Sequence, residues 1–311
     1  MALFQLPTVR REDDVPAGEI LAAKYRVERV LGAGGMGVVV QVRRLADEQT
    51  FALKFLRPSV ARDPSAKVRF LREAEAAGRI ESPHVVHISE VGTLDTGTPY
   101  LLMEYLHGAT LEKLLSGGHA LPLQVACDLA LQVCEGLSAA HATGVIHRDI
   151  KPANLYLCAG EGGAKVLKIA DFGISKILDD NQNRGLTRPQ TSLGSPLYMS
   201  PEQMESASSA DFRTDQWSLG AVLYRMVTAR LPFSAGSLPA LCLQVMEGDF
   251  VPIATLCPYL PTEFAAAAER CLRVAPKERY ADMAELAQAL APFAGPQGAA
   301  HVERCRALLR G

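Results

Sequence analysis

Three side chains of different chemistry lie close together in the stretch 147–154. Asp149 is suited to take a proton, Lys151 to meet a phosphate and Asn154 to hold a metal. Pro152 removes a backbone N–H and disfavours helix at the residue before it, so we expect a loop whose side chains point at a common centre. These groups are what phosphoryl transfer to a hydroxyl requires. The alternative is a solvated polar loop, and the elements that would supply a nucleotide, a metal and a substrate groove must decide between the two.

A glycine-rich turn early in the chain is the first such element. Gly32, Gly34, Gly37 and Val39 have the spacing G-x-G-x-x-G-x-V. Without side chains, a backbone can lie close over a polyphosphate and offer it N–H groups. Dinucleotide-binding folds share part of this spacing but need a helix after the last glycine, whereas the valines at 38–40 predict a strand and hence a hairpin. A P-loop is excluded because no G-K-[ST] ending follows.

A lysine in a short apolar run is the second element. Lys54 lies within the run 51–56, which predicts a strand. A buried lysine is costly unless it is paired, although an edge-strand lysine that reaches water is the alternative. The stretch 63–80 predicts a helix that carries Glu73 and Glu75 as acidic partners. Glu73 flanks the apolar stripe of that helix, and Glu75 is the alternative.

Composition and charge limit the classes of protein. The net charge of −2 gives no reason to expect nucleic acid or an acidic membrane as a partner. The seven cysteines have no metal-ligand spacing, which indicates reduced thiols and a cytoplasmic protein. No signal-peptide core is found in the first 20 residues, and no apolar run reaches the roughly 18 residues of a membrane span.

The pattern changes from strands to helices near residues 104–109. Strands are expected at 25–30, 84–88 and 99–105, and a hairpin at 155–157 and 166–169. Helices are expected at 110–116, 122–143, 214–229, 237–247, 262–273 and 282–291. This order predicts an α+β fold with a small β-rich lobe and a larger helical lobe. The expected divisions are an arm at 1–24, a domain at 25–292 with lobes 25–105 and 109–292, and a C-terminal tail at 293–311 with helical spacing.

Taken together, these motifs resemble those of the eukaryotic-type (Hanks-type) protein kinase family, in its bacterial serine/threonine branch. The resemblance covers about 25–292 and implies the bilobal fold of that family. It is carried, in the family's order, by the glycine turn, Phe51-Ala52-Leu53-Lys54, His147-Arg148-Asp149 with Asn154, Asp171-Phe172-Gly173, Ser200-Pro201-Glu202, Asp215-Gln216-Trp217-Ser218-Leu219-Gly220 and Arg279.

The resemblance implies a role for each site residue. Asp149 would accept or orient the proton of the substrate hydroxyl, and Lys151 would neutralise the moving phosphoryl group. Asn154 and Asp171 would bind Mg²⁺, or Mn²⁺ in its place. Lys54 would contact the ATP phosphates and pair with Glu73. The ATP site as a whole would comprise Leu31, Gly32, Ala33, Gly34, Gly35, Met36, Gly37, Val39, Ala52, Lys54, Glu73, Met103, Glu104 and Leu106, with Glu104 and Leu106 binding adenine through the backbone.

The resemblance also implies substrates and regulation. Lys151-Pro152-Ala153-Asn154 resembles the serine/threonine class, so the partners would be proteins with Ser/Thr acceptors, and a homodimer would serve trans-autophosphorylation. Autophosphorylation candidates in the segment 171–202 are Thr187, Thr191 and Ser192, whose phosphates would pair with Arg148; the alternative is that these hydroxyls are merely solvated. Two other functions remain as rivals, a pseudokinase scaffold and a small-molecule kinase.

Other residues are expected to serve structure. Asp215 is expected to hold the backbone at 147–148, and Glu202 to form a buried ion pair with Arg279. His84, His87 and His141 are expected to be packing residues rather than ligands. The stretch 299–310 is expected either to dock on the helical lobe or to begin a linker.

Overall fold

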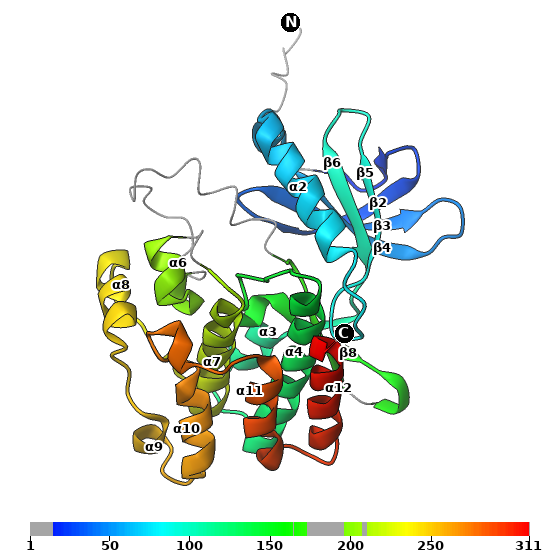
Figure 1. Ribbon diagram of the computed structural model, residues 1–311. Coiled ribbons are helices and arrows are strands. Elements are labelled where there is room, and N and C mark those ends of the chain that lie inside the picture. The colour runs from blue at the N-terminus through cyan, green and yellow to red at the C-terminus, as the bar shows by residue number, and fades with distance from the viewer. Residues whose placement is uncertain (1–14, 164, 173–195, 207–209, 311) are drawn as a thin grey trace, which may run out of the picture. The chain divides into compact units, whose positions relative to one another are not determined.

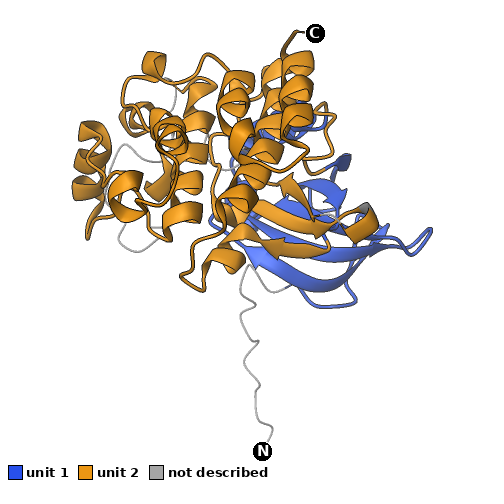
Figure 2. Ribbon diagram, turned by 90° about the horizontal axis from the view of Figure 1, so that it is seen from below, with its two compact units in different colours: residues 1–78, 87–106 blue, residues 79–86, 107–311 orange. Residues whose placement is uncertain are grey.

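The structure is a computed structural model that describes residues 15–163, 165–172, 196–206 and 210–310. The chain forms two compact units, each built from separate stretches of sequence (Figure 2). Unit 1 comprises Met1–Gly78 and His87–Leu106, and unit 2 comprises Arg79–Val86 and His107–Gly311.

Unit 1 is built on an antiparallel sheet with the strand order β1-β2-β3-β4-β6-β5. In β3 the burial alternates along the strand, as the period of two for side chains in a strand requires. Val38, Val40 and Val42 are its buried residues and join the core of the unit. The elements of unit 1 are β1 (Ile20–Leu21), β2 (Tyr25–Ala33), β3 (Gly37–Arg44), β4 (Thr50–Leu56), α1 (Pro58–Ala61), α2 (Pro64–Ala77), β5 (Ile88–Thr93) and β6 (Pro99–Glu104).

The helix α2 begins where its sequence indicates. The Asp63 side chain accepts a hydrogen bond from the backbone N–H of Ser65, and a proline occupies the first turn, where no N–H is needed. Its buried residues Ala66, Phe70, Ala74 and Ala77 recur at helical spacing and form one apolar face. The predicted helix at 63–80 is therefore confirmed, with a C-terminal end three residues earlier.

The strand predicted at 84–88 is wrong, because β5 begins at Ile88. The preceding stretch Arg79–Val86 belongs to unit 2. There the backbone N–H of Ile169 donates to the carbonyl of His84 at 2.8 Å, and the N–H of Val86 donates to the carbonyl of Ile169 at 3.0 Å. The apolar run reflects burial in unit 2 and not membership of the sheet of unit 1.

Unit 2 is mostly helical (Figure 1). It also carries a small antiparallel sheet in the order β7-β8-β9. Each helix predicted after residue 109 is found within three residues of its predicted ends, and so is the hairpin of β8 and β9. The elements are β7 (Gly108–Thr110), α3 (Leu111–Leu115), α4 (Leu123–Ala142), β8 (Leu155–Ala159), β9 (Lys165–Ile169), α6 (Pro201–Glu205), α7 (Arg213–Thr228), α8 (Leu238–Glu247), α9 (Ile253–Leu256), α10 (Thr262–Arg270), α11 (Met283–Leu290) and α12 (Gly298–Arg310), with short 3₁₀ helices at Pro152–Asn154, Glu161–Gly163, Pro196–Tyr198, Pro276–Glu278 and Ala291–Phe293.

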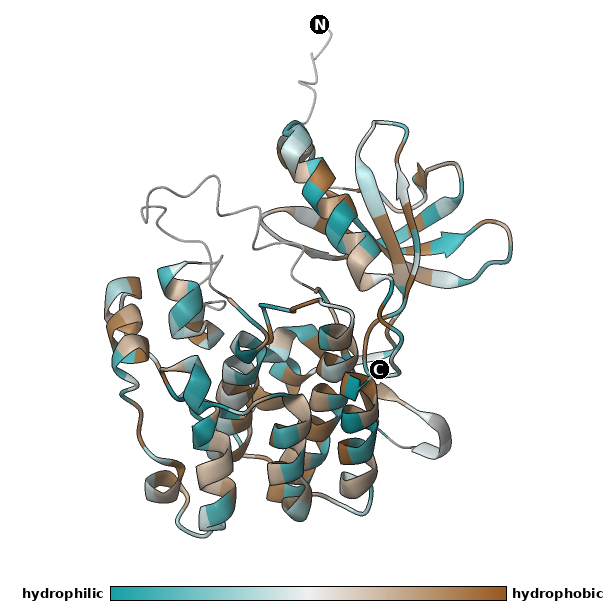
Figure 3. Cartoon of the chain, in the orientation of Figure 1, coloured by the Kyte–Doolittle hydropathy of each residue, from teal (hydrophilic) through white to brown (hydrophobic). Residues whose placement is uncertain are grey.

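The helix α4 is the centre of unit 2, and α7, α11 and α12 all pack against it. Its buried residues are mostly apolar, and hydrophobic residues run along the packed helices beside hydrophilic ones (Figure 3). The C-terminal stretch docks here as α12, which buries Val302 and Cys305. Of the two expectations for that stretch, docking is the one observed. Among the described residues, no helix combines the length and the apolar character needed to cross a membrane.

Candidate active site

The side chains of Asp149, Lys151 and Asn154 meet in unit 2. Lys151 Nζ lies 2.7 Å from Asp149 Oδ2, and Asn154 Nδ2 donates to the same oxygen at 3.2 Å and to the backbone carbonyl of Asp149 at 2.9 Å. Asp149 and Asn154 are buried, and the 3₁₀ helix Pro152–Asn154 brings the amide back toward the carboxylate. One carboxylate is thus held between an ammonium group and an amide, on the loop that the sequence predicts.

His147 orders this loop through both of its ring nitrogens. Its Nδ1 accepts the backbone N–H of Asp149 at 3.1 Å, and its Nε2 donates to the carbonyl of Ala170 at 3.0 Å. Complete burial lowers the pKa of His147, so the ring is neutral and these two contacts determine its tautomer. The ring also lies against Phe172, with 4.6 Å between the centroids. His147 therefore couples the position of Asp149 to the backbone just before Asp171.

Asp215 holds the backbone of the same loop, as the sequence predicts. Its Oδ1 accepts the N–H of Arg148 at 2.8 Å, and its Oδ2 accepts the N–H of His147 at 2.9 Å and the Nε2 hydrogen of His141 at 2.8 Å. Burial alone would raise the pKa of Asp215, but its hydrogen bond with His141 and the surrounding charges lower the pKa further than burial raises it. Arg148 has a φ of 65°, in the left-handed region that costs energy for a residue with a side chain. The buried carboxylate provides the hydrogen bonds that hold this conformation.

The two residues expected to bind metal are linked through the backbone. The N–H of Ala170 donates to the carbonyl of Asn154 at 2.9 Å, and Asp171 follows with a φ of 59°. Because Nδ2 of Asn154 is used by Asp149, its Oδ1 is the atom that would bind a metal. An amide oxygen and a carboxylate are hard ligands that suit Mg²⁺, so the donor set fits that ion.

Glu202 and Arg279 form a buried ion pair, also as predicted. Arg279 makes two contacts with Glu202, at 2.7 and 2.8 Å. Burial by itself would raise the pKa of Glu202, but the hydrogen bonds and charge of Arg279 lower it overall. The neighbouring Gln203 donates through Nε2 to the carbonyl of Arg148 at 2.8 Å. This last contact ties α6 to the loop 147–154, and no motif of the sequence points to it.

In unit 1 the predicted glycine hairpin is present. Gly32 pairs with Val39 across β2 and β3, and the N–H of Gly34 donates to the carbonyl of Gly37 at 2.9 Å. A Cβ on Gly37 would lie 2.6 Å from the carbonyl oxygen of Phe55, so packing of the sheet requires this glycine. A Cβ at Gly32, Gly34 or Gly35 would meet no described atom within 4 Å. Internal packing therefore does not explain why glycine occupies positions 32, 34 and 35, whereas the close approach of a ligand would explain it.

The remaining residues of the expected ATP site lie on strands of the same sheet and on α2. Lys54 pairs with Val39 of β3 and with Leu101 of β6, and Ala52 pairs with Met103. Ala52 and Met103 are buried. On α2, Glu73 is half-buried and Glu75 is exposed, which favours Glu73 as the acidic partner. That choice, like the roles of Glu104 and Leu106 at the end of unit 1, stays a prediction.

The candidate phosphorylation sites Thr187, Thr191 and Ser192 lie outside the described residues, as does Gly173. The sequence also gives no sign of a second cluster in unit 2. There Glu135 and His301, far apart in sequence, meet His84, and nothing in their spacing signals this contact.

Comparisons with known proteins agree with these observations. The family model described as "Protein kinase domain" matches residues 25–290. The serine/threonine-protein kinase PknB of Mycobacterium leprae is 34% identical over 86% of this chain and 42% of its own length. The serine/threonine-protein kinase pkn3 of Myxococcus xanthus is 38% identical over 73% of this chain and 41% of its own length. The chain thus spans about two fifths of the length of these curated relatives.

Among solved structures, the PknI kinase domain of Mycobacterium tuberculosis is similar in fold. Its crystal structure has a TM-score of 0.68 and 26% sequence identity, and the match covers 90% of this chain and 99% of that one. A single-residue mutant of the same domain has the same TM-score at 27% identity.

Proposed function

We propose that this chain, which belongs to the protein kinase family, transfers the γ-phosphoryl group of ATP to serine and threonine hydroxyls of proteins. The family resemblance and the fold class inferred from the motifs are both confirmed. The observation that carries the proposal is the constellation of Asp149, Lys151 and Asn154, in which a buried carboxylate contacts both a cation and an amide.

Each group of this constellation has a step in the proposed reaction. Asp149 receives or orients the proton of the attacking hydroxyl, which is the task of the catalytic-loop aspartate in protein kinases. Lys151, which already lies 2.7 Å from that carboxylate, offsets negative charge that develops on the transferred group. Mg²⁺, or Mn²⁺ in its place, supplies charge neutralisation of the phosphates, and Asn154 and Asp171 would hold it.

The nucleotide would be bound by unit 1. The glycines at 32, 34 and 35 would leave space for the triphosphate. A Cβ at these positions would meet no described atom within 4 Å, so the space beside them is open to a ligand. Lys54 would contact the phosphates with Glu73 as its partner. The full proposed set is Leu31, Gly32, Ala33, Gly34, Gly35, Met36, Gly37, Val39, Ala52, Lys54, Glu73, Met103, Glu104 and Leu106.

Two rival functions are weaker. A pseudokinase scaffold would not need Lys54, Asp149, Asn154 and Asp171 together, yet all four are present. A small-molecule kinase would not need the ordered segment after Ser200, where α6 is tied to the catalytic loop through Gln203. We further propose a cytoplasmic setting, a homodimer for trans-autophosphorylation, and regulation by phosphorylation of the segment 171–202.

The decisive experiment is a transfer assay with radiolabelled ATP, offered both protein acceptors and small alcohols. We expect label on proteins only, and Asp149→Asn to slow transfer on the order of 10²–10⁴-fold, the contribution of general acid–base catalysis. ATP binding by calorimetry should be unchanged in that variant. The exposed Asp249→Asn is the matched control. Transfer to small alcohols, or ATP binding without any transfer by the unmodified chain, would favour a rival.

Regulation needs its own test. Phosphosite mapping by mass spectrometry should find phosphate on Thr187, Thr191 or Ser192 after incubation with ATP, and Arg148→Gln should reduce the activity gained on phosphorylation. An unmodified segment in fully active protein would contradict the proposed regulation while leaving the proposed reaction intact.

A further inference from the structure

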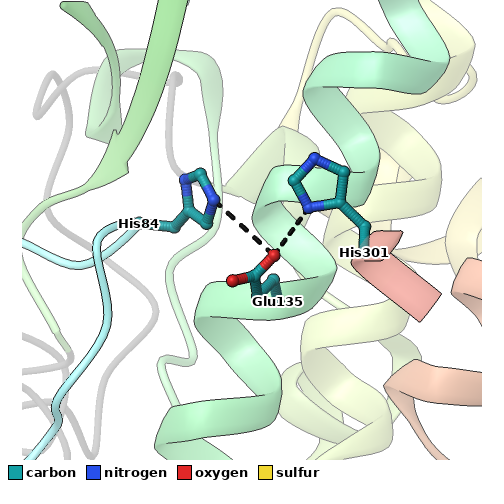
Figure 4. A group of neighbouring side chains, drawn as sticks. All are labelled: His84, Glu135 and His301. Atoms are coloured by element: carbon teal, nitrogen blue, oxygen red, sulfur yellow. Dashed lines mark hydrogen bonds and ion pairs between the residues drawn. The ribbon is translucent and has the colours of Figure 1, made fainter. Parts of the chain in front are cut away.

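Three side chains from distant parts of the sequence meet inside unit 2 (Figure 4). His84 comes from the stretch Arg79–Val86, Glu135 from α4 and His301 from α12. Glu135 Oε2 lies 3.7 Å from Nε2 of His84 and 2.6 Å from Nδ1 of His301. All three are buried, and their ligand atoms lie within 4.8 Å of one another.

The surroundings of His84 leave one ring nitrogen available. Nδ1 lies 3.0 Å from the carbonyl of Leu167 and must donate to it, so Nε2 carries the lone pair and faces Glu135. Burial lowers the pKa of His84, which favours the neutral ring that a metal requires. A histidine whose second nitrogen donates to a backbone carbonyl is a common arrangement at metal sites.

His301 has conflicting neighbours. Its Nδ1 lies 2.6 Å from the acceptor Glu135 Oε2 and 2.9 Å from Nη2 of Arg304, a donor. If Nδ1 carries a proton, it donates to Glu135, but its N–H then faces the N–H of Arg304. If Nδ1 carries no proton, it accepts from Arg304, but its lone pair then faces the carboxylate oxygen of Glu135. Arg304 also donates to Glu135 through Nε at 2.8 Å, but its side chain is 46% exposed and can move into solvent.

We propose that Nε2 of His84, Nδ1 of His301 and the carboxylate of Glu135 bind a zinc ion in place of the Arg304 guanidinium. Tetrahedral zinc with bonds of about 2.0–2.2 Å places its ligand atoms about 3.3 Å apart. The separations of 2.6 and 3.7 Å from Glu135 lie on either side of that value, and the two histidine nitrogens lie within 4.8 Å of each other. Shifts of at most about 1.5 Å therefore bring the three ligand atoms to tetrahedral spacing. Two imidazoles and one carboxylate favour zinc over Mg²⁺, which prefers oxygen ligands.

The conflict at His301 supports a metal over a purely structural cluster. A cation at the common centre takes the lone pair of His301 and one oxygen of Glu135 together, so both ligands point at one positive charge. The bound ion would join α12, α4 and the stretch Arg79–Val86.

The test is metal binding by the chelator-treated chain in excess Mg²⁺, which fills sites made of oxygen ligands. Zinc is titrated by calorimetry, and Co²⁺ by the visible absorption of its tetrahedral complexes. Removing an outer-shell partner of a metal ligand typically costs 10–100-fold in affinity, so losing a ligand in His84→Ala or His301→Ala should cost on the order of 100-fold or more. His119→Ala, which removes an exposed histidine of the same unit, should leave binding unchanged.

A further variant tests the site without removing a ligand. Arg304→Gln should bind zinc about fivefold tighter, because an exposed ion pair that competes for the ligand atoms is worth up to about that factor. A structural cluster without metal would show no such gain. No zinc binding by the unmodified chain, thiolate charge-transfer bands with Co²⁺, or unchanged affinity in His301→Ala would each overturn the proposal. If the alanine variants fail to fold, Arg304→Gln decides.

Discussion

Replacement of Arg279 by methionine should strongly destabilise the protein, since methionine keeps much of the side chain's volume but none of its donors. The Arg279 side chain is 0% exposed and that of Glu202 is 9% exposed. Besides its two contacts with Glu202, the guanidinium donates to the carbonyls of Arg273, Arg213 and Val274 and lies 5.0 Å above the ring of Trp217.

The magnitude follows from what the substitution leaves behind. Glu202 would remain buried, with the hydroxyl of Thr214 at 2.9 Å as its remaining side-chain donor among the contacts described. An uncompensated charge of this kind costs about 3–5 kcal/mol of unfolding free energy. At roughly 2–4 °C per kcal/mol for a domain of about this size, the melting temperature should fall by roughly 6–20 °C.

Calorimetry and urea unfolding measure the effect, and two variants interpret it. Arg306→Met removes an exposed arginine paired with Glu303, and should cost no more than about 1 kcal/mol. Glu202→Leu combined with Arg279→Met should be more stable than the sum of the single changes, because the charge left unpaired is gone. If Arg279→Met cost no more than Arg306→Met, removing the buried partner of Glu202 would not destabilise the fold, and the expectation would be refuted.

Three further outcomes are expected. Asp215→Asn should lower kcat on the order of 10-fold or more with little change in KM for ATP, since losing one charge-assisted hydrogen bond costs about 1.5–3 kcal/mol; steady-state kinetics would show this, and an unchanged kcat would contradict it. Gly37→Ala should destabilise the protein through the 2.6 Å approach to a carbonyl oxygen, whereas Gly34→Ala should leave stability unchanged and weaken ATP binding; thermal melts and calorimetry separate the two, and equal melting temperatures would contradict it. The lowered pKa of Glu202 should stabilise the protein fully above the ordinary value of 4.5, and this stabilisation should be lost as the pH falls through the lower folded-state pKa. The difference in unfolding free energy between the unmodified protein and Glu202→Gln should therefore shrink in acid. Urea unfolding at several pH values measures this difference.

The sequence predicts most of the elements because their signals are local. The run of valines in β3, the apolar spacing of α2 and the glycine turn each depend on neighbours within a few residues. The same holds for the loop 147–154, where Pro152 begins the 3₁₀ helix that brings Asn154 back to Asp149.

What could not be predicted depends on contacts between distant segments. An apolar run such as Val85-Val86 signals burial but not the partner, so the prediction for the stretch before β5 is wrong. The contact of His84 with Glu135 and His301 joins three segments whose spacing has no period, and the sequence therefore offers only a packing role for His84 and no role for the other two. Packing in three dimensions, rather than any motif, brings them together.

The division of the chain has a consequence for protein engineering. The chain passes between units 1 and 2 at 78/79, 86/87 and 106/107, so neither unit is a continuous stretch. A fragment ending at residue 106 would carry Val85 and Val86 without Ile169, to which they pair. A fragment starting at residue 107 would carry Ile169 of β9 without these two partners. Chimeras that exchange unit 1 with that of a relative should therefore keep residues 79–86 with the recipient, which requires three junctions instead of one.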